Sequence, residues 1–187
     1  MREVAVTDCL TRVPPHSAYI RDIPQPHTKD IPLVMNTLAD TAALIAVLGA
    51  AIIYGTDVFC ALVLRPAASG ASDASVADLL GRVHAYGDRR LPVPGVLAIV
   101  ATALATATDD STPARIGGAV ALAALLLWLA VYLRISAPIN KRLRAAAADR
   151  TVPADTRQLQ QRWDSVIWTR ALLQTMALAG LLTIVLI

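Results

Sequence analysis

Charged residues are scarce in this sequence. They make up 17% of the 187 residues, whereas soluble domains usually contain about a quarter. Hydrophobic residues make up 56%, and the mean hydropathy is +0.54. This composition argues against an ordinary soluble domain and is typical of a helical membrane protein, provided that the apolar residues are clustered.

Cysteines, aromatic residues and the best-known catalytic motifs are also rare or missing. The only cysteines are Cys9 and Cys60. Because the topology inferred below places them on opposite sides of a membrane, we expect no disulfide between them. The sequence has no phosphate-binding glycine loop, no Gly-x-Ser-x-Gly and no zincin motif. These absences argue against the common nucleotide-binding, serine-hydrolase and zinc-protease sites.

The apolar residues are gathered into long segments. Uncharged runs cover residues 91–108, 116–133 and 171–187, and residues 41–64 contain a single charged residue, Asp57. A spanning helix needs about 20 apolar residues, and at this length only a helix satisfies its own backbone hydrogen bonds in lipid. The sequence therefore predicts an all-α fold, a bundle of four transmembrane helices with amphipathic extensions, with spans near 41–64, 91–108, 116–133 and 170–187.

Residues 1–35 differ from the rest of the chain. They are rich in proline, mixed in charge, and contain no apolar core of the kind that a cleavable signal peptide needs. We expect a flexible tail here, followed by a membrane domain over residues 36–187. His16 and His27 in this tail are expected to have no role, although weak metal binding is an alternative.

The basic residues indicate a topology. Residues 65–90 and 134–170 carry 12 of the 17 lysines and arginines. With four spans these two segments lie on one side, which the positive-inside rule identifies as the cytoplasm. We therefore expect an integral protein of the plasma (inner) membrane with both termini outside. The lipid bilayer accounts for the positive charge, so there is no reason to expect nucleic-acid binding, and nothing indicates an oligomeric state.

Local signals predict where the helices begin and end. Ser75 and Asp78 fit a capping box, which predicts an amphipathic helix over 75–90. Pro66 should end the first span.

The third and fourth spans carry their own boundary signals. Pro138 should end or bend the third span near Ala137, so that Asn140 caps the helix that follows. After residue 155 no breaker interrupts the sequence, which predicts one long helix into the fourth span.

His84 is the first candidate for chemistry. Asp88 lies one helical turn later, so the imidazole and the carboxylate share a helix face. Such a pair can act as a general base, because the carboxylate fixes the tautomer of the ring and raises its basicity. Arg90 could then stabilise an anion. The alternative is an ordinary solvated helix face, which the pattern alone favours.

Asp57 is the second candidate, because a carboxylate inside a span is costly and normally faces the bundle interior. Arg134 lies near the same depth and is one candidate for its partner. Asp57 is interpreted either as a proton-handling or metal-binding group, or as a structural or hydrated carboxylate. A metal held by His84, Asp88 and Asp57, or a haem on His84, stays open as an alternative.

Near the third and fourth spans the sequence resembles a known family. Pro138-Ile139-Asn140, then Arg162-Trp163-Asp164 and Arg170, are similar to segments of the anthrone oxygenase-like family of small four-helix membrane proteins. FCALVLRPA and HAYGDRRLPVPG match more loosely. One departure is that the family often has a polar residue, frequently His, where this chain has Ile167 and Trp168.

The resemblance implies oxidation of a flat polycyclic anthrone to an anthraquinone by O₂, without a dedicated organic cofactor. It implies that Asn140, Trp163 and Arg170 lie at the working region. With the residue-based candidates, the expected catalytic residues are His84, Asp88, Asp57 and Asn140, and those expected to bind substrate are Arg90, Arg134, Trp163 and Arg170. The competing hypothesis is a non-enzymatic membrane module that binds a hydrophobic small molecule or haem, or supports a partner complex.

The predicted topology can be tested by cysteine accessibility. Asp73→Cys and Ala147→Cys both lie in segments assigned to the cytoplasm by their positive charge. We expect each to be labelled by a thiol reagent only after the cells are opened. Labelling of either position from outside intact cells would contradict the topology.

Overall fold

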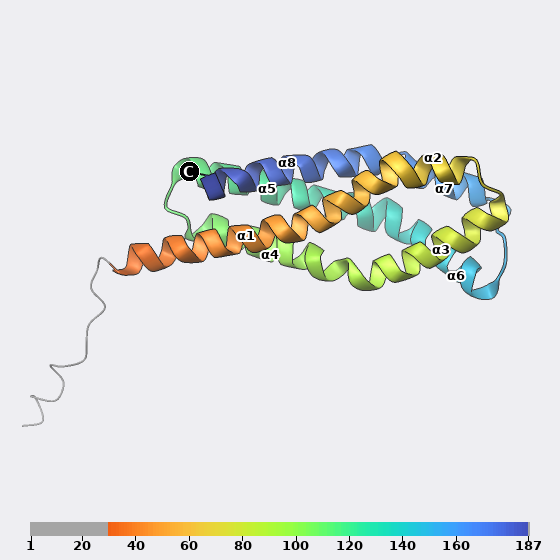
Figure 1. Ribbon diagram of the computed structural model, residues 1–187, viewed down its shortest axis with the longest axis horizontal. Helices are drawn as coiled ribbons and strands as arrows, with labels where there is room; N and C mark the ends of the chain where they lie inside the picture. The colour runs from red at the N-terminus through yellow and green to blue at the C-terminus, as the bar shows by residue number, and fades with distance from the viewer. Residues whose placement is uncertain (1–29, 187) are drawn as a thin grey trace, which may run out of the picture. The chain divides into compact units, whose positions relative to one another are not determined.

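The structure is a computed structural model that describes residues 30–186. These residues form helices and short connections, with no strand among them (Figure 1). With η for a π-helix, the elements are α1 (Asp30–Phe59), η1 (Cys60–Leu64), α2 (Arg65–Ser69), α3 (Asp73–Arg90), α4 (Pro92–Thr108), α5 (Thr112–Val131), η2 (Tyr132–Ser136), α6 (Ala137–Asp149), α7 (Thr156–Asp164) and α8 (Ile167–Leu186). The all-α prediction is confirmed for this part of the chain.

The chain divides into two units, residues 1–33 and residues 34–187, and the packed helices belong to the second unit. The expected flexible tail, with Cys9, His16 and His27, falls almost entirely outside the described residues. Its predicted properties therefore stay predictions.

Three helical stretches are long and apolar enough to cross a membrane. They are Thr37–Ser69, Thr112–Asp149 and Thr156–Leu186. α3 and α4 pass the same test together, but this pair is bent by 41°. The described residues thus contain three candidate spans, or four if the bent pair forms one span. The predicted span near 91–108 therefore counts as a membrane span only if α3 and α4 together form one.

Pro138 does not end the third span, and the expectation that the helix would stop there was wrong. The helix continues through it as a single stretch, Thr112–Asp149. Just before the proline, the backbone N–H of Ala137 bonds to the carbonyl of Tyr132, five residues back instead of four. In an α-helix a proline ring collides with the carbonyl four residues earlier. The wider π turn of η2 relieves this collision and keeps the helix continuous.

The first span shows the same arrangement. η1 precedes Pro66, the N–H of Arg65 bonds to the carbonyl of Cys60, and the helix continues to Ser69. The expectation that Pro66 ends the span was therefore also wrong. Single π turns are frequent at functional sites, and both of these lie beside the site described below.

Two other helix boundaries differ from expectation. α3 begins at Asp73 because Ser72 is its N-cap, with its hydroxyl accepting a hydrogen bond from the N–H of Ser75. The predicted cap at Ser75 was thus three residues late. The long helix expected after residue 155 is interrupted by a turn at residues 165–166, which separates α7 from α8.

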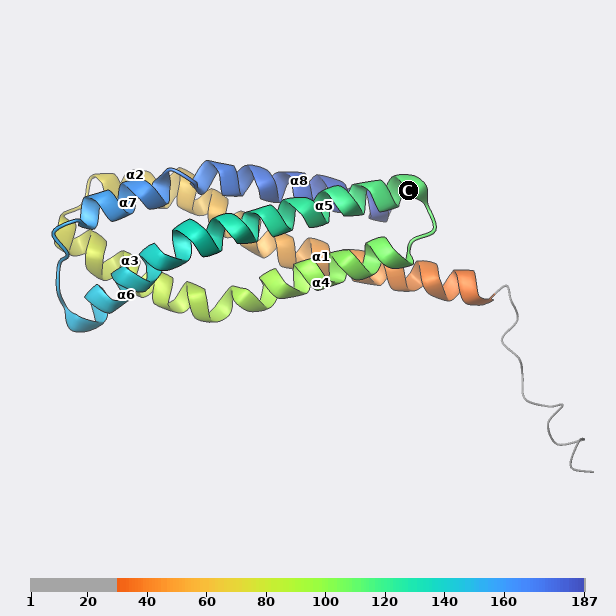
Figure 2. The same ribbon diagram turned by 180° about the vertical axis from the view of Figure 1, so that it is seen from behind.

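Small residues allow the apolar parts of the helices to pack closely. α5 and α8 lie side by side in Figures 1 and 2. Gly117 and Gly180 face each other there, and a Cβ on either would collide with the carbonyl of the other. The surrounding core, called here the alanine core, comprises Ala42, Ala43, Ala46, Ala50, Ala98, Ala101, Ala105, Ala114, Ala121, Ala124, Leu125, Ala177, Leu181 and Ile184.

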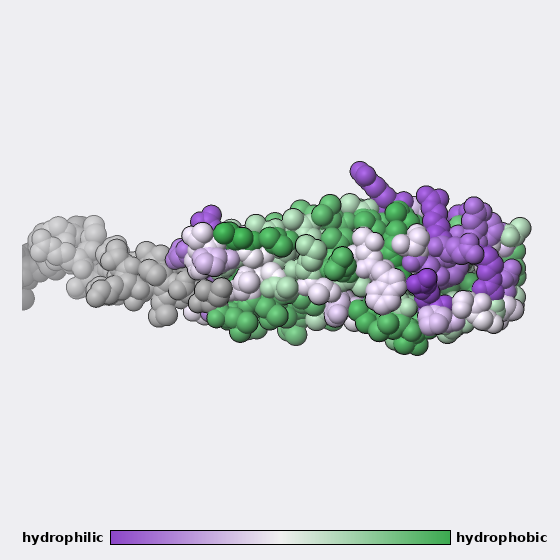
Figure 3. Space-filling view, turned by 90° about the horizontal axis from the view of Figure 1, so that it is seen from above, coloured by the Kyte–Doolittle hydropathy of each residue, from purple (hydrophilic) through white to green (hydrophobic). Residues whose placement is uncertain are grey.

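A second core lies nearer the basic end of the unit. It comprises Cys60, Ala61, Ala68, Val76, Leu80, Ile139, Leu143, Leu159, Trp163 and Ile167, drawn from η1, α2, α3, α6, α7 and α8. Figure 3 shows hydrophilic side chains gathered over this end, next to a band of hydrophobic surface. The candidate site lies between the two cores.

The close approach of α5 and α8 predicts a contrast between two glycines. Gly180→Ala places a methyl group against the backbone carbonyl of Gly117, whereas Gly55→Ala meets nothing within 4 Å. We expect Gly180→Ala to cost about 1–3 kcal/mol of stability through overpacking. Gly55→Ala should be neutral or slightly stabilising, because alanine has the higher helix propensity. Thermal unfolding in a mild detergent would measure both, and equal midpoints would contradict this packing.

Candidate functional site

A buried ion pair links the first and last helices. Asp57 Oδ1 lies 2.6 Å from Arg170 Nη2, and the Trp128 indole N–H donates to Asp57 Oδ2 at 3.0 Å. Asp57 is 1% exposed and Arg170 is 7% exposed. Buried charges are tolerated only when they are paired and hydrogen-bonded. Arg134, the candidate partner from the sequence, is exposed, and Arg170 forms the ion pair with Asp57 instead.

Three aromatic rings surround the Arg170 guanidinium. Its central carbon lies 5.8 Å from the ring centroid of Trp128, 5.7 Å from that of Tyr132 and 5.6 Å from that of Trp163. Nη1 donates to the hydroxyl of Ser136 at 3.0 Å. Cation–π attraction acts at these distances. Nε of Arg170 is buried and has no hydrogen-bond partner among the described residues.

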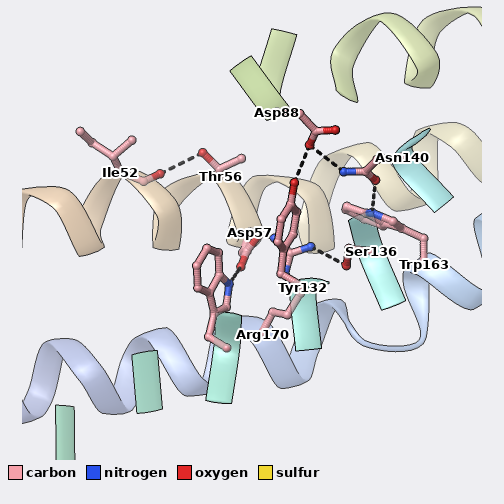
Figure 4. A network of polar contacts seen from close by, with 10 residues as sticks. Ile52, Thr56, Asp57, Asp88, Tyr132, Ser136, Asn140, Trp163 and Arg170 are labelled. Carbon is pink, nitrogen blue, oxygen red and sulfur yellow. Dashed lines mark hydrogen bonds and ion pairs between the residues drawn. The ribbon is translucent and has the colours of Figure 1, made fainter. Parts of the chain in front are cut away.

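Asp88 is the centre of a second polar cluster. Its Oδ1 accepts hydrogen bonds from the Tyr132 hydroxyl at 2.7 Å and from Asn140 Nδ2 at 2.9 Å. Its Oδ2 lies 3.2 Å from Arg144 Nη1. Figure 4 shows Tyr132 standing between this cluster and Asp57. The phenol therefore links the two clusters, with its ring beside Arg170 and its hydroxyl on Asp88.

Asn140 makes a second link between the clusters. Its Nδ2 donates to Asp88, and its Oδ1 accepts a hydrogen bond from the Trp163 indole N–H at 3.1 Å. Because Asn140 lies inside α6 with its side chain used in this way, the expectation that it caps a helix was wrong. The amide instead fixes the position of Trp163, whose ring is part of the aromatic enclosure around Arg170.

His84 lies beside these clusters without joining them. It is 7% exposed, and its ring centroid lies 5.4 Å from that of Trp163, with the planes tilted by 44°. Nε2 is buried without a hydrogen-bond partner in the described part of the chain. No hydrogen bond or ion pair between described residues joins His84 to Asp88. The predicted direct pairing of His84 with Asp88 is therefore wrong. Asp88 instead contacts Tyr132, Asn140 and Arg144.

A cavity of about 280 Å³ brings these groups together. Apolar side chains of α1, α3, α4 and α5 form much of its wall. Its polar and aromatic lining consists of Thr56, Asp57, Cys60, His84, Asp88, Trp128, Tyr132, Asn140, Trp163 and Arg170. The arrangement is an apolar slot with a buried imidazole, two carboxylates and a guanidinium on its wall.

Six of the eight expected site residues line this cavity: His84, Asp88, Asp57, Asn140, Trp163 and Arg170. The other two do not. Arg134 is exposed, and Arg90 is exposed with its guanidinium over the ring of Tyr86 at 5.2 Å. Within residues 30–186 no group of three or more His, Cys, Asp or Glu side chains is placed to hold a metal ion. The metal site of His84, Asp88 and Asp57 therefore does not form among them.

Trp128, Tyr132 and Ser136 were missed at the sequence level. A signal was present, because these three residues and Asn140 follow one another at intervals of four. Residues four apart lie on one helix face, so this polar stripe indicates a face turned toward a common partner. Arg170 was expected in the site, but not as the counter-ion of Asp57.

The site lies where the hydrocarbon layer should end. α5 has 20 residues, which span about 30 Å, the thickness of a bilayer core. Tyr132 and Ser136 follow directly after α5. A hydrophobic molecule in the bilayer would therefore meet the polar groups at one membrane boundary.

The ion pair predicts a strong dependence of stability on both partners. Asp57→Ala leaves the Arg170 guanidinium buried without its carboxylate, which should cost about 3–5 kcal/mol. Asp57→Ala combined with Arg170→Met removes both charges and should restore part of this loss. The exposed pair of Arg142 and Asp155 is the control, and Arg142→Ala should cost about 0–1 kcal/mol. Detergent-phase unfolding would rank the variants, and a double variant as unstable as Asp57→Ala would contradict the pairing.

Comparison with known proteins agrees with this region of the chain. A family model described as anthrone oxygenase matches residues 82–180, which is more than half of the 187 residues. The match begins within α3, ends within α8, and includes His84, Asp88, Asn140 and Arg170. No curated protein and no solved structure matches the chain significantly. The chain therefore belongs to the anthrone oxygenase family.

Proposed function

We propose that this protein is a membrane oxidase that uses O₂ to oxidise a flat, hydrophobic polycyclic substrate of the anthrone type. The observation that carries the proposal is that His84, whose Nε2 is buried without a hydrogen-bond partner among the described residues, is one of the residues lining a mainly apolar cavity. A buried nitrogen without a partner is unusual in a folded protein, and a substrate proton would provide one. Membership of the anthrone oxygenase family supports the reaction class.

The shape and lining of the cavity suit such a substrate. Its volume of about 280 Å³ is near the lower end of small-molecule pockets, about 300–1,000 Å³. Trp128, Tyr132 and Trp163 supply aromatic surface on which a fused ring system can stack. Binding relies on this apolar and aromatic surface, and the few polar groups determine the orientation of the substrate.

In the proposed first step, neutral His84 takes a proton from the methylene carbon of the central ring. The electrons of the broken C–H bond move into the ring system and leave negative charge on the carbonyl oxygen. A positively charged or hydrogen-bonding group near that oxygen lowers the barrier. Arg170 fits this role, because its side chain lines the same cavity and its Nε has no hydrogen-bond partner among the described residues.

In the second step, O₂ oxidises the carbanion and forms a C–O bond, which gives a hydroperoxide after proton transfer. Loss of the remaining C–H proton and cleavage of the O–O bond then leave a carbonyl group and release water. Anthrone and O₂ are thus converted in equal amounts to anthraquinone and water. The ring carbon is oxidised and both atoms of O₂ are reduced.

The proposal places the protein in the plasma membrane with four spans, both termini outside and the basic end in the cytoplasm. The concentration of 12 of 17 basic residues in two segments supports this orientation. The substrate enters from the lipid between the helices. Its reactive carbon then reaches the polar wall at the membrane boundary.

The test is turnover of anthrone by the full-length protein in lipid nanodiscs, measured as O₂ uptake and anthraquinone absorbance. His84→Gln keeps a polar side chain of similar reach and removes the proton-accepting imidazole. We expect it to lower turnover by about 10²-fold or more, because general-base catalysis contributes at least that much. Empty nanodiscs give the uncatalysed oxidation rate to be subtracted.

Arg82→Gln is the matched control, because Arg82 is on the same helix as His84 but is exposed and paired with Asp78. It should leave turnover unchanged. Equal turnover by His84→Gln and the wild type would remove His84 as the base. Binding of anthrone by the wild type without any oxidation would favour the non-enzymatic alternative, a membrane module that holds a hydrophobic ligand.

A further inference from the structure

A second hollow lies on the surface between α3 and α6. It has a volume of about 470 Å³ and is lined by Ala85, Arg89, Lys141, Arg144, Ala145 and Ala148. Three cations thus face one groove, and every other lining residue is an alanine. The short alanine side chains leave room between the cations for a ligand group.

Two of these cations have no counter-charge within the described residues. Arg89 and Lys141 are exposed and take part in no ion pair there, whereas Arg144 lies 3.2 Å from Asp88. Like charges that share a groove repel each other. The helices cannot separate to relieve this repulsion, because α3 and α6 pack tightly at Gly81, where a Cβ would collide with the carbonyl of Leu143. The groove is therefore a fixed site with an excess of positive charge.

The groove lies at the level of lipid headgroups. Arg89 is four residues before Val93, an exposed apolar side chain of α4. Because the chain bends by 41° between α3 and α4, these four residues span at most about 6 Å along one direction. The headgroup region adds about 5–8 Å on each side of the hydrocarbon core. The cations of the groove therefore lie close to the plane of the phosphates when Val93 contacts the acyl chains.

We propose that this groove binds the phosphate group of an anionic phospholipid such as phosphatidylglycerol. Arg89 provides a planar fork that can hold two phosphate oxygens, and Lys141 adds a point charge from the opposite helix. Arg144 provides a third charge on the side of Asp88. A free phosphate ion has the same charged group but no acyl chains, so only the lipid also gains from the apolar surface next to the groove.

The test is lipid binding by the full-length protein in a neutral detergent, measured by native mass spectrometry with short-chain phosphatidylglycerol. The double variant Arg89→Gln/Lys141→Gln removes the two unpaired cations and leaves Arg144 with Asp88. We expect about a 10-fold or greater loss of affinity, since each basic residue near an anionic membrane surface contributes appreciably to binding. Ala145→Glu, which adds a negative charge to the groove without removing a cation, should also weaken binding.

The matched control is Arg82→Gln/Arg142→Gln, which removes the same charge from the same two helices outside the groove. It should keep nearly the wild-type affinity. An equal loss in both double variants would overturn the proposal, because binding would then follow net charge alone. Equal binding of short-chain phosphatidylcholine would overturn it too. Displacement of the lipid by inorganic phosphate at the same concentration would assign the groove to free phosphate instead.

Discussion

The ion pair between Asp57 and Arg170 is the interaction on which the arrangement of the site depends. Two charges removed from water need partners for every remaining donor and acceptor, or the cost of desolvation exceeds their attraction. Trp128 and Ser136 supply two of these partners from the helical stretch Thr112–Asp149. The pair therefore fixes three helices relative to one another, and it sets where the alanine core ends and the polar residues begin.

The cavity follows from the same constraint. Groups that must reach partners on other helices cannot also fill the space between them, and Gly87 and Gly95 on the cavity wall have no side chain that could do so. Asp88, Asn140 and Tyr132 hold the far wall in place through mutual hydrogen bonds. His84 is thereby left on the wall of a rigid hollow, buried and without a partner for Nε2.

The sequence predicted the helices and six of the ten polar and aromatic residues on the cavity wall. Polar residues inside apolar segments are costly to bury, so they stand out in a sequence and indicate a role. The predictions failed where the outcome depended on the direction in which a side chain points from its helix. Arg134 was chosen as the partner of Asp57 by depth alone, but depth does not tell which way a side chain points from a helix. Pro138 was expected to end a helix because the local rule does not foresee a π turn. The spacing of Trp128, Tyr132, Ser136 and Asn140 indicated a shared helix face, but it could not identify Asp57 and Arg170 as the groups that this face contacts.

The two π turns limit the insertions and deletions that this sequence can accept. A π turn contains one residue more than an α turn, so it rotates everything after it by about 100° around the helix axis. α6 therefore presents a different face from the one that α5 alone would dictate, and α2 follows η1 in the same way. A single-residue deletion in η2 would rotate α6 relative to α5 and carry Asn140 away from Asp88, and it would also bring back the collision between Pro138 and the preceding turn. The number of residues at these junctions is therefore constrained independently of which residues occupy them.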